Sequence, residues 1–146
     1  MEINIRSAKI SDSVAIAELS KQLGYETEVV AVQHRLEKIL KHSENCIYTA
    51  TTKEGEVVGW IHGFYALRVE ANFFVEIGGL VVNTNFRKNG IGQKLVDKVI
   101  EWSRSKNYTK LRVRCNAIRK ESHKFYEKIG FELNKEQKVF DIKLPE

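Results

Sequence analysis

A basic, glycine-containing loop is the stretch of this sequence best suited to binding an anion. It comprises Arg87, Lys88, Asn89, Gly90, Ile91 and Gly92, and it joins an apolar β-type run at residues 73–82 to an amphipathic helix. The first amides of a helix have no intrahelical acceptor, and its dipole places partial positive charge there. Gly90 and Gly92 leave the backbone open to a phosphate, and Arg87 and Lys88 add charge. The loop therefore predicts a pyrophosphate-binding site.

Simpler interpretations of this loop remain open. The P-loop pattern is absent, and Leu95 stands where a dinucleotide fingerprint needs its third glycine. The loop could equally be a helix start that happens to be rich in glycine and positive charge.

Other residues before and after the loop also suggest chemistry. Gly78 and Gly79 interrupt a good strand, which indicates a bulge or a close backbone approach. Glu76 lies in the same apolar strand, where an ionised carboxylate is costly to bury unless it is paired or solvated. We weigh a functional role for Glu76 against pairing with an arginine, which could be Arg68, Arg112 or Arg114.

Alternating hydrophobic patterns and glycine turns predict the elements that must position these residues. Strands are expected at residues 2–8, 46–52, 57–67, 73–82, 111–115, 131–133 and 138–144. Helices are expected at residues 14–23, capped by Ser11 or Asp12, and at 28–41, 91–104 and 119–129, the last closed by Gly130. The order β-α-α-β-β-β-α-β-α-β-β predicts a single α/β (α+β) domain over residues 1–146. Its one mixed, mostly antiparallel sheet of about seven strands would carry helices on both faces.

Length and composition fit an ordinary globular protein. The chain has 146 residues and a net charge of +5, with acidic and basic residues interspersed. This charge permits an anionic ligand, and the mixed pattern argues against a nucleic-acid partner. Two cysteines without metal-type spacing, and no apolar run long enough to span a membrane, lead us to expect a cytoplasmic protein with reduced thiols, no metal and no membrane partner.

Two motifs together resemble the GNAT superfamily of acyl-coenzyme A-dependent N-acetyltransferases. They are R-K-N-G-I-G after the fourth strand and N-A-I-R-K-E-S-H-K-F-Y-E-K-I-G-F near the end, and the resemblance covers nearly the whole chain. The family's loop pattern is met by Arg87, Gly90 and Gly92. More loosely, the chain looks like small bacterial members of the aminoglycoside 6'-N-acetyltransferase type.

The resemblance implies acetyl-CoA as cofactor and assigns roles to particular residues. The loop amides would hold the pyrophosphate, and the pantetheine arm would lie where the fourth strand parts from its neighbour. The implied cofactor-binding residues are Leu80, Val81, Val82, Arg87, Lys88, Asn89, Gly90, Ile91, Gly92, Gln93, Asn116 and Ser122.

The catalytic roles implied are those of an acid and a base. Tyr126 matches the family's usual acid, and Glu76 looks like the base of GNAT histone acetyltransferases. Tyr126 could instead pack on the sheet, and His62 and His123 remain alternative bases because histidine titrates in the right range. Tyr126 and Glu76 would serve direct attack of a primary amine in a ternary complex.

The acceptor is the least determined part of the prediction. Tyr25, Glu26 and Glu28 lie where the family walls its acceptor side, so an acidic rim for a cationic amine is one interpretation. Charged helix ends are the simpler one. The alternative function is a non-catalytic acyl-CoA-binding sensor or scaffold, and a homodimer is left open.

Overall fold

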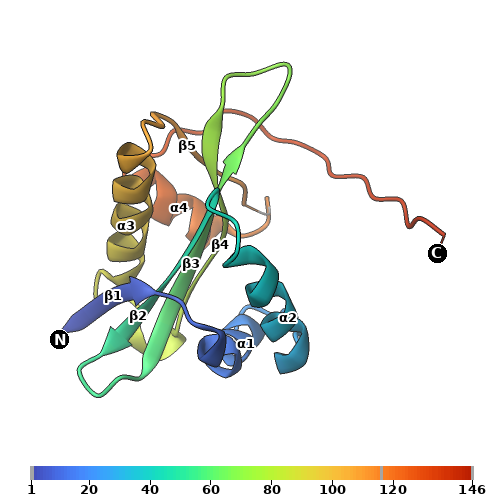
Figure 1. Cartoon of the computed structure of the whole chain (residues 1–146). Coiled ribbons are helices and arrows are strands. Elements are labelled where there is room, and N and C mark those ends of the chain that lie inside the picture. The colour runs from blue at the N-terminus through green and yellow to red at the C-terminus, as the bar shows by residue number, and fades with distance from the viewer. Residues whose placement is uncertain (1, 116, 146) are drawn as a thin grey trace. The chain divides into compact units, whose positions relative to one another are not determined.

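One five-stranded sheet organises the chain from its first strand to residue 113. The computed structural model describes residues 2–115 and 117–145. The strands are β1 (Ile3–Ser7), β2 (Asn45–Thr52), β3 (Val57–Ala66), β4 (Phe74–Val82) and β5 (Leu111–Val113), in the order β1-β2-β3-β4-β5 (Figure 1). The first four strands are antiparallel neighbours, and β5 pairs with β4 in parallel. The mixed, mostly antiparallel sheet is therefore confirmed.

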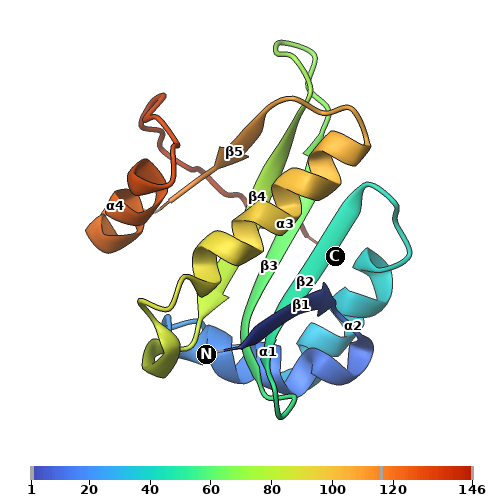
Figure 2. The same ribbon diagram turned by 90° about the vertical axis from the view of Figure 1, so that its left-hand side faces the viewer.

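Helices cover both faces of this sheet. On one face lies α3 (Ile91–Ser105), and on the other lie α1 (Ser13–Lys21) and α2 (Val29–Ile39), as Figure 2 shows. Gly59 and Gly63 of β3 face α3, since a Cβ on either would lie 3.0–3.2 Å from side-chain carbons of that helix. The side chains of Ile47 and Trp60 point the other way and pack with Ile16 of α1 and Leu36 of α2. Short 3-10 turns, η1 (Ile10–Asp12) and η2 (Thr84–Phe86), precede α1 and α3.

The chain divides into two compact units, residues 1–114 and 115–146. The second contains α4 (Lys120–Lys128), which ends before Gly130 at a φ of +110°, as predicted. No described helix is long and apolar enough to cross a membrane.

The prediction of seven strands was wrong. Residues 131–145 of the second unit form neither strand nor helix. Apolar alternation favours a strand only where a neighbour pairs with it and a core buries one face. Here the side chains of Leu133, Phe140 and Ile142 are 77%, 88% and 84% exposed.

The first helix does begin after one of its two predicted N-cap residues, Asp12, but not through a side-chain cap. Asp12 makes no side-chain capping bond to α1. Its carboxylate instead accepts 2.8 and 2.9 Å bonds from Arg6 and a 2.7 Å bond from the backbone N–H of Lys9. Burial alone would raise the pKa of Asp12, but these bonds and the charges of Arg6 and Lys9 outweigh it and lower that pKa.

We expect Asp12→Asn to destabilise the fold in a pH-dependent way. A carboxylate whose pKa is lowered in the folded state stabilises that state above its unfolded value of about 3.9, and this contribution is lost as the pH falls. Urea unfolding at pH 7 should show a loss of about 1–3 kcal/mol, typical of charged hydrogen bonds, and the loss should shrink below pH 4. Glu54→Gln, in the exposed β2–β3 turn, is the matched control. A pH-independent loss would contradict this assignment.

Candidate active site

The register of the sheet breaks in the middle of β4. His62 of β3 pairs with Gly79, whereas the next residue, Gly63, pairs with Ile77, so Gly78 is the extra residue of a bulge. The parallel register between β4 and β5 ends at the same level, at Ile77 and Val113. The expectation of a bulge is confirmed, and beyond it β4 continues to Val82 without β5 beside it.

A side chain at either bulge glycine would crowd the aromatic rings of β3, most severely at Gly79. A Cβ on Gly79 would lie 2.6 Å from the indole ring of Trp60, and a Cβ on Gly78 would lie 3.0 Å from the ring of Phe64. Aromatic side chains thus occupy the space that any larger residue would need. The backbone of Gly78 stays exposed, so a ligand could reach it.

The loop after β4 leaves the start of α3 open. Gly90 is the N-cap of α3 at a φ of +74°, in the left-handed region that favours glycine, and no side chain caps the helix. Lys88 also has a positive φ, of +68°. The side chain of Asn89 turns back to the carbonyl oxygens of Phe86 and Arg87, at 3.0 and 3.4 Å. This arrangement fits an anion such as a diphosphate.

The predicted cofactor-binding residues of this unit differ in what they can offer. The exposed side chains of Arg87 and Lys88 are available to a ligand. Ile91 is 1% exposed and part of the core, so only its amide could bind, while the side-chain amide of Gln93 donates a 2.9 Å bond to Asp97. Leu80 and Val82 are half-buried and Val81 is buried.

Glu76 lies beside the bulge and is paired with an arginine. Its Oε1 lies 3.2 Å from Nε of Arg114, and its side chain is 14% exposed. Of the three arginines weighed as partners, Arg114 is the one in ion-pair contact. The ion pair holds the Glu76 carboxylate on the sheet face that carries α1 and α2, and a carboxylate in such a pair can still act as a base.

His62 occupies the same face as Glu76. Its Nε2 is 2.8 Å from Oδ1 of Asn45, an arrangement in which Nε2 donates and Nδ1 is the free acceptor. Nδ1 lies 3.2 Å from where a Cβ on Gly78 would be. Burial lowers the pKa of His62, so the ring stays neutral at pH 7. His62 is thus an alternative proton acceptor at the bulge.

Tyr126 belongs to the second unit, in α4. Its ring makes edge contacts with Phe125 and Phe131, with centroids 5.1 and 5.4 Å apart. Burial, with a smaller effect from Cys115, raises the pKa of Tyr126 and keeps the phenol protonated. Ser122 and His123 are half-buried on the same helix, and Asn116 lies outside the described residues.

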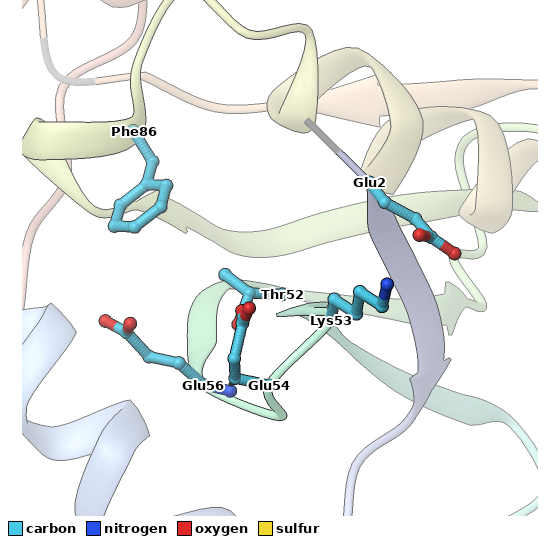
Figure 3. Close-up of a pocket in the computed structure, with 6 residues that line it drawn as sticks. All are labelled: Glu2, Thr52, Lys53, Glu54, Glu56 and Phe86. Atoms are coloured by element: carbon cyan, nitrogen blue, oxygen red, sulfur yellow. Dashed lines mark hydrogen bonds between the residues drawn. The ribbon is translucent and has the colours of Figure 1, made fainter.

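The residues expected around the acceptor are all exposed. Tyr25, Glu26 and Glu28 lie in or next to the connection between α1 and α2. The described residues contain no cluster of three or more potential metal ligands. A surface pocket shown in Figure 3 lies elsewhere, at the β2–β3 turn, and contains none of the predicted site residues; it is lined by Glu2, Thr52, Lys53, Glu54, Glu56 and Phe86.

A group of cations near Glu76 was not predicted as part of a site. Arg68, Lys110 and Arg112 all lie within 6 Å of the ring of Phe74, at 5.6, 5.8 and 4.5 Å from its centroid. We call these three residues the cation cluster. The alternation of Lys110, Arg112 and Arg114, in β5 and directly before and after it, is the sequence signal that could have revealed it.

Comparison with known proteins identifies the family. The model of the GNAT acetyltransferase family matches residues 14–131. N-acetylaspartate synthetase of Xenopus tropicalis is 32% identical over 92 residues, which are 63% of this chain and 32% of that protein's length. An uncharacterised N-acetyltransferase of Chlorobaculum tepidum is 30% identical over 95 residues, 64% of this chain and 56% of that one. The chain thus spans about a third to a half of the length of these relatives.

Solved structures share the fold. Aminoglycoside 6'-N-acetyltransferase AAC(6')-Ih from Acinetobacter baumannii superposes with a TM-score of 0.86 at 17% identity, over 99% of this chain and 100% of that one. AAC(6')-Iy, solved in complex with a bisubstrate analogue containing CoA, gives the same TM-score at 19% identity over 99% and 100% of the two chains. With the family match, the register break and the open helix start, the conclusion is that this chain belongs to the GNAT family of acetyltransferases, whose usual cosubstrate is acetyl-CoA.

Proposed function

We propose that this protein transfers an acetyl group from acetyl-CoA to a primary amine by direct attack in a ternary complex. The observation that carries the proposal is the register break at Gly78. From there β4 no longer pairs with β5 and continues towards the uncapped start of α3. Bound acetyl-CoA supplies a thioester carbonyl open to attack. The amides at the start of α3, with Arg87 and Lys88, would hold its diphosphate.

The remaining chemistry is proton transfer. As the C–N bond forms and the C–S bond breaks, Glu76 accepts the amine proton, directly or through a water, and Tyr126 donates a proton to the sulfur. A covalent enzyme intermediate on cysteine is disfavoured because burial raises the pKa of Cys46 to about 12 and also raises the pKa of Cys115. Both therefore remain thiols, which are poor nucleophiles.

The experiment is a thiol-release assay with acetyl-CoA against polyamines, aminoglycosides, amino acids and lysine peptides. The names of the related proteins point to different acceptors, aspartate in one case and aminoglycosides in others, so the panel covers both. Release that depends on an amine supports the proposal. Stabilisation by acetyl-CoA without any turnover would instead favour a binding module.

We expect Glu76→Gln to lower kcat/KM by about 10²-fold, the lower end of the usual contribution of a general base. The low-pH limb of the rate profile, where the base becomes protonated, should flatten. Glu101→Gln is the control, since Glu101 also pairs with a cation, Lys98 at 3.3 Å, but on α3. An unaltered low-pH limb would mean that another group is the general base. His62→Gln tests the other candidate proton acceptor at the bulge.

A further inference from the structure

The cation cluster lies on the sheet face that carries Glu76. Phe74 and Glu76 are two residues apart in β4 and so point to the same side. Arg112 is the register partner of Glu76 on β5, and its guanidinium lies 4.5 Å from the centre of the Phe74 ring. Phe64, the other register partner of Glu76, points away from α3. The cluster and the candidate base therefore share one face.

This part of the face is not covered by the helices of the first unit. In Figures 1 and 2, α1 and α2 lie towards the β2–β3 turn, and the end of the sheet where β3 leads into β4 extends past them. The side chain of Arg68 is 34% exposed, Arg112 is half-buried and Lys110 is exposed. A small molecule in contact with Glu76 could therefore reach the cluster.

The charges in this region do not cancel. The guanidinium of Arg68 lies 3.7 Å from the carboxylate of Glu70, and Arg114 is paired with Glu76. Lys110 and Arg112 have no ion-pair partner in the described part of the chain, which leaves an excess of two positive charges. Phe74 is fully buried under these side chains, so its ring holds the guanidinium of Arg112 in place through a cation–π contact. A guanidinium held in this way suits a carboxylate, which it can bind through two hydrogen bonds.

We infer that the acceptor is an amine that also carries a carboxylate, and that Arg112, assisted by Lys110, binds this carboxylate. This inference rests on the proposed function. Arg112 is the register partner of Glu76, and neighbouring strands lie about 5 Å apart, so both groups are within reach of one small molecule. An amine at the bulge beside Glu76 would thus place its carboxylate at the cluster. A polycationic acceptor would be repelled by the excess positive charge of the cluster.

The test compares amino acids with amino-acid amides of the same side chain in the thiol-release assay. For the wild-type protein, kcat/KM for the better amino acids should exceed that for their amides at least tenfold, and spermidine should be poorer still. Arg112→Gln should raise KM for the acids about tenfold and leave KM for the amides and for acetyl-CoA unchanged. Arg112→Lys, which keeps the charge, should restore part of the preference.

Arg104→Gln removes one positive charge from the exposed face of α3 and is the matched control. Lys110→Gln gives a second measurement of the same preference should Arg112→Gln fail to fold. Two outcomes would overturn the inference and leave the proposed function intact. One is that amides or polyamines react as fast as the acids; the other is that Arg112→Gln lowers kcat/KM equally for acids and amides. Absence of thiol release with every amine would contradict the proposed function itself.

Discussion

Tyr126→Phe should lower kcat by about 10²–10³-fold, within the range for loss of a general acid, while KM for acetyl-CoA stays within twofold. The substitution removes one hydroxyl and keeps the ring that contacts Phe125 and Phe131, so α4 should be unaffected. Because burial raises the pKa of Tyr126, its proton is present throughout the usable pH range. We therefore expect no alkaline limb from this residue below pH 10. Thiol release under saturating substrates measures the effect.

Tyr48→Phe is the control for this experiment. Tyr48 is a half-buried tyrosine of β2 on the face that packs on α3, where Lys98 lies 5.7 Å from its ring. Its hydroxyl has no proposed role, so the rate should be unchanged. A Tyr126→Phe protein with the wild-type rate would remove the tyrosine from the mechanism. Loss of acetyl-CoA binding in this variant would instead assign it to the cofactor site.

The segment from β4 to α3 could be predicted from sequence because its signals are local. The apolar run at residues 73–82 marks a strand, the spacing of Leu95, Val96 and Val99 marks a helix, and the glycines between them allow the turn that joins the two. The bulge at Gly78 was predictable for the same reason, because adjacent glycines weaken a strand and are typical of a bulge or of a close backbone approach. The structure bears out both features to within a residue or two.

Most of the features that the sequence did not predict depend on contacts between residues far apart in the chain. The run at residues 138–144 alternates as a strand does, but pairing partners are not encoded in its own pattern. Asp12 lies at a predicted N-cap position, but its carboxylate pairs with Arg6, only six positions earlier, which the helix pattern by itself does not indicate. The partner of Glu76 and the stacking of Arg112 on Phe74 both require the parallel register of β4 with β5, which brings together residues more than 30 positions apart.

The largest effect on cofactor binding is expected from Gly92→Asp. A carboxylate in the first turn of α3 would neutralise the partial positive charge of the helix start and would repel a diphosphate bound there. The same charge interacts favourably with the helix dipole, so the ligand-free protein should melt at the wild-type temperature or slightly above it. Wild-type protein at acetyl-CoA concentrations about 100 times Kd should gain about 2.7 kcal/mol of stability, and the variant should gain almost none.

This design separates binding from folding because the two effects have opposite signs. Val30→Asp is the control: it puts the same charge into the first turn of α2, at a side chain that is already 63% exposed. It should keep the full acetyl-CoA shift in melting temperature. If acetyl-CoA still stabilised the Gly92→Asp protein as much as the wild type, the diphosphate would be bound elsewhere. The proposed role of Gly90 and its loop would then be wrong. A fall in the melting temperature of the ligand-free variant would mean that the helix start is structural, because a vacant anion site should not lose stability when a carboxylate enters it.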